Sequence, residues 1–480
     1  MTTTNPNAYG SVLAGDHDGA APLVALPERA DDKPGSVRAP ILLFCAVFAW
    51  TYYLSALVSP RYFGIGVDNF WFDADVPRYV CQSVDAFAND HWRNKVHPLF
   101  SLLVWPLPNA LHLLGIDFVT GIRLQTALVT AIGMLFLYLA LRRLALTAAV
   151  AMLLIAFTAT GASVMAWFAI TESYAYTFAA VAMMFYLLAG DRVAGWRSRH
   201  GRTVQWVVGI GLAFAVTISN IVLAGLLALQ ALGLRRAIKV GALAIAAVGV
   251  LAVAQRLLFP SSGVFFLPSA LGGEAAFLHA LSAERLRELF AIVFFGSYVF
   301  LNVKQVPSDG GQALTVQHAT LSSDVPTTLC LVLLGVLYLA GLYPLLRRLG
   351  SSTRQALHGG AQATGESARE PATLVALPVI GGIAFLLMLH SVYGKETFLY
   401  TGSFLPFLTI ILGVALASPF IKRRRLAIPI LACLLAGNIV HNYPTWRAAV
   451  SSLQHAAQQP LSQKALNRNT CGFVKRNLLS

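Results

Sequence analysis

The sequence predicts an all-α polytopic membrane protein with about 11 transmembrane helices. Its mean hydropathy is +0.66, and only 12% of its residues are charged, against about a quarter in soluble domains. Apolar runs close to the ~20 residues that a bilayer requires recur along the whole chain. Backbone polar groups in lipid must be satisfied within each segment. Because the runs are too long and too evenly apolar for barrel strands, we expect them to be helices.

The predicted spans alternate with short connectors that carry many of the basic residues. We place spans near 39–59, 119–141, 145–166, 171–190, 203–218, 219–234, 237–258, 326–346, 372–390, 402–420 and 426–443. The connectors hold basic clusters at 142–143, 192–202, 235–239, 347–354 and 422–425. With the N-terminus in the cytoplasm, all these clusters lie on the cytoplasmic side, as the positive-inside rule requires. Topology therefore accounts for the net charge of +14, and we expect no nucleic-acid partner.

The same pattern divides the chain into regions. Residues 1–38 are polar and aperiodic, which predicts a disordered cytosolic tail without a removable signal peptide. Residues 39–443 form the predicted transmembrane domain, with outer loops at 60–118 and 259–325, and residues 444–480 form an extracytoplasmic tail. We expect a multi-pass protein of a bacterial inner membrane, with the N-terminus in the cytoplasm and the C-terminus outside.

Three stretches depart from simple spanning helices. Residues 203–234 are short for two full spans and predict a hairpin of short helices. Residues 97–114 are interrupted by Pro106 and Pro108, which favours a juxtamembrane or re-entrant element. Residues 275–290 mix charges with leucines, which is typical of an interfacial amphipathic helix.

Two of the five cysteines fall in the predicted outer regions. Cys81 and Cys471 would both face an oxidising compartment, so a disulfide between the outer loop and the tail is one expectation. The other three lie inside predicted helices, where a free thiol behaves as a small apolar side chain.

The segment 60–97 is the first candidate for a functional site. It holds five of the 21 acidic residues, at 68, 73, 75, 85 and 90, in a chain that is 57% apolar. Asp73 and Asp75 lie beside Phe70, Trp71 and Phe72, and burial against apolar surface raises a carboxyl pKa and makes a better base. The alternative is a solvated loop with local ion pairs, such as one between Asp75 and Arg78 at i,i+3.

Glu172 is the second candidate, because it lies at the predicted outer end of the fourth span. An ionisable residue there is expensive unless it faces water or a partner, which favours a functional role. The alternative is a turn-and-cap residue, since Thr171 and Ser173 flank it where a helix begins.

Cationic residues form a third group, at Arg93, Lys95 and His97. They either extend toward lipid phosphates at the interface or bind the phosphate of a substrate through charge-assisted hydrogen bonds. A fourth patch is the predicted outward turn at 390–400, in which Lys395 and Glu396 either pair with each other or face the same cavity as the first loop.

Common catalytic motifs are missing from the sequence. There is no Walker loop, no HExxH, no GxSxG and no Cys/His metal spacing. Asp73-Ala-Asp75 is a DxD pair, but a hard cation needs about six oxygen ligands, so we treat a divalent cation as an optional ligand and assign no metal site or cofactor.

Several of these features together resemble a known superfamily. They are an N-terminal span, a long acidic outer loop, the His97-Pro-Leu element, and Gly121-Ile-Arg-Leu-Gln-Thr-Ala-Leu running into Tyr138-Leu-Ala-Leu-Arg-Arg143. This pattern resembles the GT-C superfamily of integral-membrane glycosyltransferases. It is most similar to family-39-like bacterial members, which are related to protein O-mannosyltransferases and lipid A aminoarabinose transferases. The resemblance covers residues 40–190 and returns at Thr397-Phe-Leu-Tyr-Thr-Gly-Ser-Phe-Leu-Pro406.

The resemblance implies a GT-C-like helix arrangement and an outward-facing active site. It implies an inverting glycosyltransferase that moves a sugar from a polyprenyl-phosphate donor to a hydroxyl of a glycan, lipid or protein acceptor, with membrane lipid around it. A lipid-linked sugar flippase or transporter, or a glycan polymerase or ligase, is the alternative. A flippase fits less well because the ionisable residues lie outside the predicted spans rather than at the membrane centre.

The resemblance also implies roles for particular residues. An acidic residue of the first outer loop would be the base, here Asp75 or Asp73, and Glu172 matches a second acidic position. The donor phosphate would be bound by cationic or imidazole groups, here His97, Lys95, Arg93 and Arg78. Lys395, Glu396 and Tyr400 are further candidates for the same cavity. The chain departs from the usual pattern in having Asp-Ala-Asp instead of adjacent acids, and His-Pro-Leu where many relatives have two prolines.

Overall fold

A computed structural model describes most of the chain. The described residues are 37–63, 71–191, 199–266, 274–308, 311–316, 324–358, 370–394, 396–419, 421 and 425–457. The chain divides into two units, Met1–Val37 and Arg38–Ser480. Of the first unit only residue 37 is described. The predicted disordered tail therefore lies outside the described residues, and the helices and strands named here belong to the second unit.

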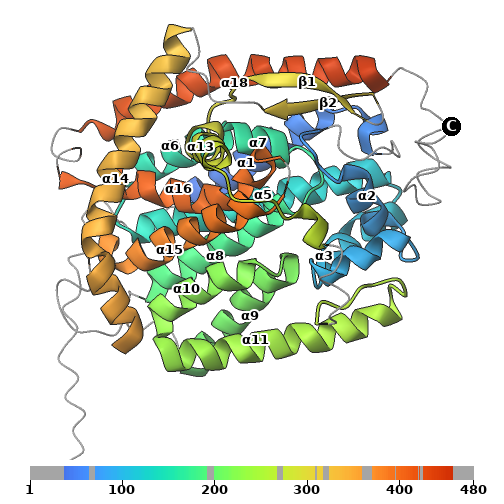
Figure 1. Ribbon diagram of the computed structural model, residues 1–480, viewed down its shortest axis with the longest axis horizontal. Coiled ribbons are helices and arrows are strands. Elements are labelled where there is room, and N and C mark those ends of the chain that lie inside the picture. Colours follow the sequence, from blue (N-terminus) through green and yellow to red (C-terminus); the bar gives the residue numbers. More distant parts are fainter. Residues whose placement is uncertain are drawn as a thin grey trace, which may run out of the picture. The chain divides into compact units, whose positions relative to one another are not determined.

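The described part of the second unit is largely helical (Figure 1). A helix lies at each place where a span is predicted, although one predicted span, 145–166, is divided between two helices. These helices are α1 (Arg38–Leu57), α5 (Phe118–Arg143), α6 (Ala148–Ala159), α7 (Ala162–Trp167), α8 (Tyr174–Asp191), α9 (Arg199–Val216), α10 (Asn220–Leu232), α11 (Leu234–Ala254), α14 (Val325–His358), α15 (Pro371–Val392), α16 (Thr401–Leu416) and α18 (Ala427–Ala457).

Seven helices in the described part are long and apolar enough to cross a membrane, so the protein is a multi-pass helical membrane protein. They are α1, α5, α11, α14, α15, α16 with the turn before it, and α18. The predicted count of eleven crossings is not confirmed. The remaining apolar helices are shorter, at 148–159, 174–190, 201–216 and 220–232. At 1.5 Å per residue such helices fall short of the ~30 Å hydrocarbon core.

The break between α6 and α7 follows from a close approach of two chain segments at Gly161. The main-chain N–H groups of Ala162 and Ser163 donate to the carbonyls of Tyr298 and Ser297, at 3.1 and 3.0 Å. A Cβ on Gly161 would lie 3.0 Å from the Thr158 carbonyl and 3.2 Å from that of Ser297. The second outer loop therefore docks where the predicted span 145–166 is interrupted.

The first outer loop consists of short helices. They are η1 (Pro60–Phe63), α2 (Val76–Val84), η2 (Asn89–Lys95), α3 (Phe100–Val104) and α4 (Pro106–Leu113). The predicted interruption at Pro106 is confirmed, because this proline begins α4 directly after α3 has ended. Proline suits the first turn of a helix, where its missing N–H has no partner to lose.

The second outer loop contains short helices and a β-hairpin that the sequence analysis did not predict. The turn η3 (Gln255–Leu257) completes the long apolar helix before the loop. The elements of the loop are η4 (Glu274–Phe277), α13 (Ala283–Ala291), the π-helix η5 (Ile292–Gly296), β1 (Val303–Ser308) and β2 (Gly311–Val316). The strands are antiparallel, with Val303 opposite Val316. The hairpin lies beside α18, which continues to Ala457 instead of ending at the predicted residue 443 (Figure 1).

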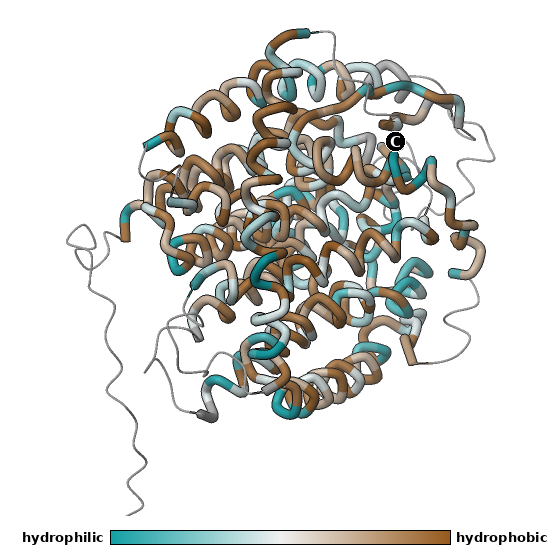
Figure 2. Tube along the Cα trace, turned by 60° about the vertical axis from the view of Figure 1, so that its left-hand side comes forward, coloured by the Kyte–Doolittle hydropathy of each residue, from teal (hydrophilic) through white to brown (hydrophobic). Residues whose placement is uncertain are grey.

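Aromatic packing anchors the first loop against the helices. Trp71 forms an isolated bridge with Leu314 of β2, and its indole N–H donates to the Ala166 carbonyl at 2.9 Å. The ring of Phe72 packs edge-on against Trp167 and Phe398, with centroids 5.7 and 5.1 Å apart. Apolar residues, coloured brown, dominate the helices of the described chain (Figure 2). The residues after Trp71 are thereby fixed over the ends of α7 and α16.

Candidate functional site

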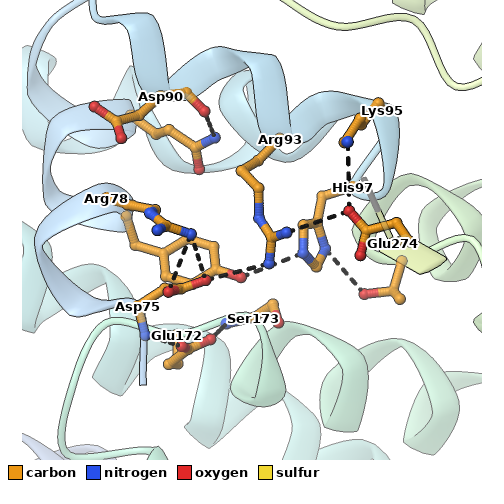
Figure 3. A network of polar contacts seen from close by, with 12 residues as sticks. Asp75, Arg78, Asp90, Arg93, Lys95, His97, Glu172, Ser173 and Glu274 are labelled. Atoms are coloured by element: carbon orange, nitrogen blue, oxygen red, sulfur yellow. Dashed lines mark hydrogen bonds and ion pairs between the residues drawn. The ribbon is translucent and has the colours of Figure 1, made fainter. Parts of the chain in front are cut away.

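Asp75 is the N-cap residue of α2, but its side chain makes no capping hydrogen bond. An N-cap aspartate ordinarily accepts from the amides of the first helical turn. Here the carboxylate lies 3.2 Å from the guanidinium of Arg78 and 3.2 Å from that of Arg93 (Figure 3). Ion pairing thus takes the place of capping. The side chain retains 19% of its exposure, so its oxygens are within reach of a ligand.

Glu172 lies directly beneath this group, in the connection between α7 and α8, and is 3% exposed. Its Oε1 accepts the main-chain N–H of Asp75 at 3.0 Å, and its Oε2 accepts that of Ser173 at 2.9 Å. Burial raises the pKa of the Glu172 carboxyl to about 8, and the Asp75 charge adds to this, while the two hydrogen bonds and Arg93 oppose it. Both oxygens are engaged, so Glu172 holds the main chain at Asp75 in place.

Arg93 and Lys95 both come from η2. Arg93 points toward Asp75 and Glu274, and Lys95 points toward Glu274 (Figure 3). Arg93 extends between Asp75 and Glu274, with its second nitrogen 3.5 Å from Glu274 Oε1. Lys95 Nζ lies 3.5 Å from the same oxygen. Burial lowers the pKa of the Arg93 guanidinium, but Asp75, Tyr79 and Glu274 raise it more, so the pKa is raised overall and the group stays charged.

His97 is buried close to this group, but as a neutral ring. Burial and the Arg93 charge lower the pKa of its imidazole to about 3, against a weaker opposing effect of the hydrogen bond to Val216. Nδ1 lies 2.7 Å from the Val216 carbonyl, which needs a donor, so Nδ1 carries the proton and Nε2 accepts from the Tyr79 hydroxyl at 3.3 Å. In this state His97 supplies no positive charge for a phosphate.

Asp73 belongs to a second group of charges. Phe72 and Asp73 have φ angles of 50° and 66°, in the left-handed region that side chains rarely adopt. Burial raises the pKa of Glu396 to about 7, opposed by hydrogen bonds from Thr315 and the Phe398 amide, and the charges of Glu288 and Asp73 raise it further. Asp73 thus acts electrostatically on Glu396, while the carboxylate of Asp75, two residues on, forms ion pairs with Arg78 and Arg93.

Tyr400 connects the two groups. It is 9% exposed, and its hydroxyl interacts electrostatically with Asp73 and Arg285 and also with Arg93 and Asp75. The turn before it is fixed by Gly394, whose φ is 87° and whose Cα faces the tyrosine hydroxyl so closely that a Cβ would collide with it. Glu396 and Tyr400 thus interact electrostatically with residues of the first loop. Lys395 lies outside the described residues, so its predicted pairing with Glu396 stays a prediction.

Two further expectations concern cysteines and metal ions. Cys81 is disulfide-bonded, and Cys471, its predicted partner, lies outside the described residues. In the part of the chain that the structure describes, no group of three or more His, Cys, Asp or Glu residues could hold a metal ion. The Asp73-Ala-Asp75 pair is divided between the two groups of charges, a poor arrangement for joint ligation.

Sequence reasoning missed Glu274 and Tyr393. Glu274 Oε1 meets Arg93 and Lys95, and its Oε2 accepts the Tyr393 hydroxyl at 2.6 Å. A carboxylate in a largely apolar second loop was a usable signal, but nothing in the local pattern relates position 274 to position 93. The contact depends on the tertiary fold.

Comparisons with known proteins do not assign a family. No family model, no curated protein and no solved structure matches this chain. The fold and the site define a multi-pass helical membrane protein with a charged site in the loops between its long helices, and the case for an activity rests on the chemistry of that site.

Proposed function

We propose that the protein is an inverting glycosyltransferase that uses a polyprenyl-phosphate sugar donor. The observation that carries the proposal is the grouping of one partly exposed carboxylate, Asp75, with Arg78, Arg93 and Lys95. A base and a cationic phosphate site within a few ångströms are what displacement of a lipid phosphate from a sugar requires. The resemblance of residues 40–190 to the GT-C superfamily supports the same activity.

The charges of the described group suit a phosphodiester. Three basic side chains, Arg78, Arg93 and Lys95, accompany two acidic ones, Asp75 and Glu274, which gives the group a formal charge of one positive unit. Glu172 adds no full charge at neutral pH, because its pKa is raised to about 8. A sugar–phosphate–lipid carries one negative charge, so its binding would neutralise the group. Guanidinium groups bind phosphate through paired, charge-assisted hydrogen bonds.

In the proposed mechanism Asp75 accepts the proton of the acceptor hydroxyl. The acceptor oxygen attacks the anomeric carbon from the face opposite the phosphate, and the bond between that carbon and the phosphate oxygen breaks. The electron pair of this bond leaves on the phosphate, whose charge grows from one to two, and configuration inverts in the single displacement. Arg93 and Lys95 stabilise the growing charge.

The ion pairs of Asp75 make its strength as a base depend on whether the donor is bound. In the ligand-free site Arg78 and Arg93 hold the carboxylate ionised, which keeps it ready to accept a proton but weakens its basicity. A donor phosphate competes for the same guanidinium groups. When they turn toward it, Asp75 loses part of its compensation and becomes the stronger base. Glu172 fixes the Asp75 main chain throughout and acts as a positioning residue.

The test is transfer of labelled sugar from a polyprenyl-phosphate sugar pool by purified protein in lipid, with a membrane extract as the acceptor source. Wild type would be compared with Asp73→Asn, Asp75→Asn and Glu172→Gln, each checked for folding by thermal unfolding. We expect labelled product from wild type and its loss in Asp75→Asn. Unchanged transfer in all three variants would reject the site. No transfer by wild type, together with measurable lipid movement, would indicate a flippase.

A further inference from the structure

Glu274 is the one carboxylate from the second outer loop that reaches the cations of the first loop in the described structure. Its Oε1 lies 3.5 Å from both Arg93 Nη1 and Lys95 Nζ, and its Oε2 accepts the Tyr393 hydroxyl at 2.6 Å (Figure 3). The side chains of Glu274, Lys95 and Arg93 are 13%, 14% and 17% exposed. A loop carboxylate thus occupies the position between two cations that a bound anion would take.

We infer that Glu274 is an internal occupant of a phosphate site formed by Arg93 and Lys95, and that the phosphate of the substrate displaces it. This inference rests on the proposed function, because it identifies what the donor phosphate must compete with. Because the donor phosphate must displace Glu274, this residue helps to set the affinity of the site for the donor. The sequence analysis gave that role to no residue.

The geometry of the contact favours displacement. Charge-assisted hydrogen bonds between nitrogen and oxygen are about 2.7–2.9 Å long, whereas both contacts of Glu274 Oε1 are 3.5 Å. Arg93 divides its guanidinium between this shared oxygen and Asp75, and Lys95 shares the oxygen with Arg93. A phosphate presents several oxygens and can approach both Arg93 and Lys95 at closer range. The stronger bond of Glu274 is the one to Tyr393, on its other oxygen.

The charge change during transfer favours displacement as well. The leaving phosphate gains a second negative charge, and a carboxylate between the same two cations would repel it. Removal of Glu274 from this position leaves both cations to the phosphate. If the Glu274 carboxylate stayed between the two cations, it would weaken their stabilisation of the leaving phosphate as that phosphate gains its second negative charge.

Main-chain contacts fix the segment that directly follows Glu274, so the proposed displacement involves the Glu274 side chain and not this segment. Leu278 is bridged to Tyr393, the His279 amide donates to the Val392 carbonyl at 2.8 Å, and the Gly394 amide donates to the Phe277 carbonyl at 3.0 Å. These bonds hold residues 277–279 against the end of α15. Glu274 can therefore turn away from Arg93 and Lys95 while it keeps its hydrogen bond to Tyr393.

The inference is tested by ligand binding to the full-length protein in detergent, with Glu274→Gln as the variant. Glutamine keeps the size and the hydrogen-bonding capacity of the side chain but removes its charge. The matched control is Glu370→Gln, which removes a carboxylate from the partly exposed ion pair with Arg348, 2.6 Å apart, outside the site. The ligands are a short-chain polyprenyl monophosphate, inorganic phosphate, and the phosphate-free polyprenol.

We expect Glu274→Gln to bind the polyprenyl monophosphate about three- to fivefold more tightly than wild type, because a competing ion pair is removed. Polyprenol binding and the Glu370→Gln control should be unchanged. A gain for the lipid phosphate alone identifies a lipid headgroup as the competitor, and a gain for inorganic phosphate as well identifies the phosphate itself. Either result supports the displacement.

Other outcomes overturn the inference or the function separately. Equal or weaker binding by Glu274→Gln, with clear binding by wild type, would show that Glu274 orients the cations, and would leave the proposed function standing. An equal gain for polyprenol would mean that charge competition is not the cause. Absence of phosphate-lipid binding in both proteins would reject the proposed function, and the inference with it.

Discussion

The main-chain amide of Asp75 donates a hydrogen bond to Oε1 of Glu172, at 3.0 Å, and so joins two residues that are 97 positions apart. The bond fixes the start of α2 against the connection between α7 and α8. It leaves the Asp75 side chain to the arginines and keeps Glu172 buried. The predictions below follow from this arrangement.

The raised pKa of Glu172 makes stability depend on pH. In the folded state this carboxyl holds its proton up to about pH 8, against a usual value of 4.5. Between these values the unfolded chain binds fewer protons, so stability falls as pH rises from 4.5 to 8 and then levels off. We expect the Tm of Glu172→Gln to fall less over this range than that of wild type. Parallel Tm curves would contradict the assignment, and Glu370→Gln is the matched control.

Arg93 connects the two loops, so its geometry as well as its charge is expected to matter. Lysine keeps the charge but cannot extend one planar group between Asp75 and Glu274. We expect Arg93→Lys to lower kcat/KM for transfer by roughly 10–100-fold, the equivalent of one charge-assisted contact. The matched control is Arg287→Lys on exposed α13. Transfer kinetics as efficient as wild type in Arg93→Lys would show that charge alone suffices.

The imidazole of His97 is expected to stay neutral through the physiological range. Its pKa is lowered to about 3, because burial and Arg93 disfavour the charged ring. Ring ¹⁵N NMR, assigned with a His97→Gln variant, should show one protonated and one bare nitrogen from pH 8 down to pH 5. A titration near the ordinary value of 6.5 would contradict this and would return His97 to the phosphate-binding group.

The orientation of the chain can be tested by cysteine labelling. Glu284 lies exposed on α13 and Arg235 lies exposed at the start of α11, on predicted opposite sides of the membrane. In a background without the free cysteines Cys45, Cys330 and Cys433, an impermeant maleimide should label Glu284→Cys in sealed right-side-out vesicles. Arg235→Cys should react only after the vesicles are opened. The reverse pattern would place the charged site in the cytoplasm.

Much of the fold could be predicted because hydrophobicity is a local property. Each predicted span coincides with helical structure, and the interruption at Pro106 follows from the chemistry of proline. The number of crossings could not be predicted as well. The break between α6 and α7 lies at Gly161, where the amides of the next two residues donate to the Tyr298 and Ser297 carbonyls, and that contact is not visible in a hydropathy profile.

Several candidate residues that the sequence analysis named lie close together in the structure, but the contacts between them could not be predicted. Asp75, Arg93 and Lys95 come together near Glu172, within the set of residues that the sequence analysis named. The separation of Asp73 from Asp75 depends on positive φ angles at Phe72 and Asp73, which packing of Phe72 imposes. Glu274 could not be found from the sequence, because its partners lie in another loop.

The most direct test of the central claim is a single-turnover measurement with saturating polyprenyl-phosphate sugar, in wild type and Asp75→Asn. The donor affinity of each protein would be measured in parallel. Asparagine keeps the shape of the side chain but cannot accept the proton, so we expect donor binding to be retained and transfer to fall by about 10²–10⁴-fold. Transfer at the wild-type rate by folded, donor-bound Asp75→Asn would show that Asp75 is not the base.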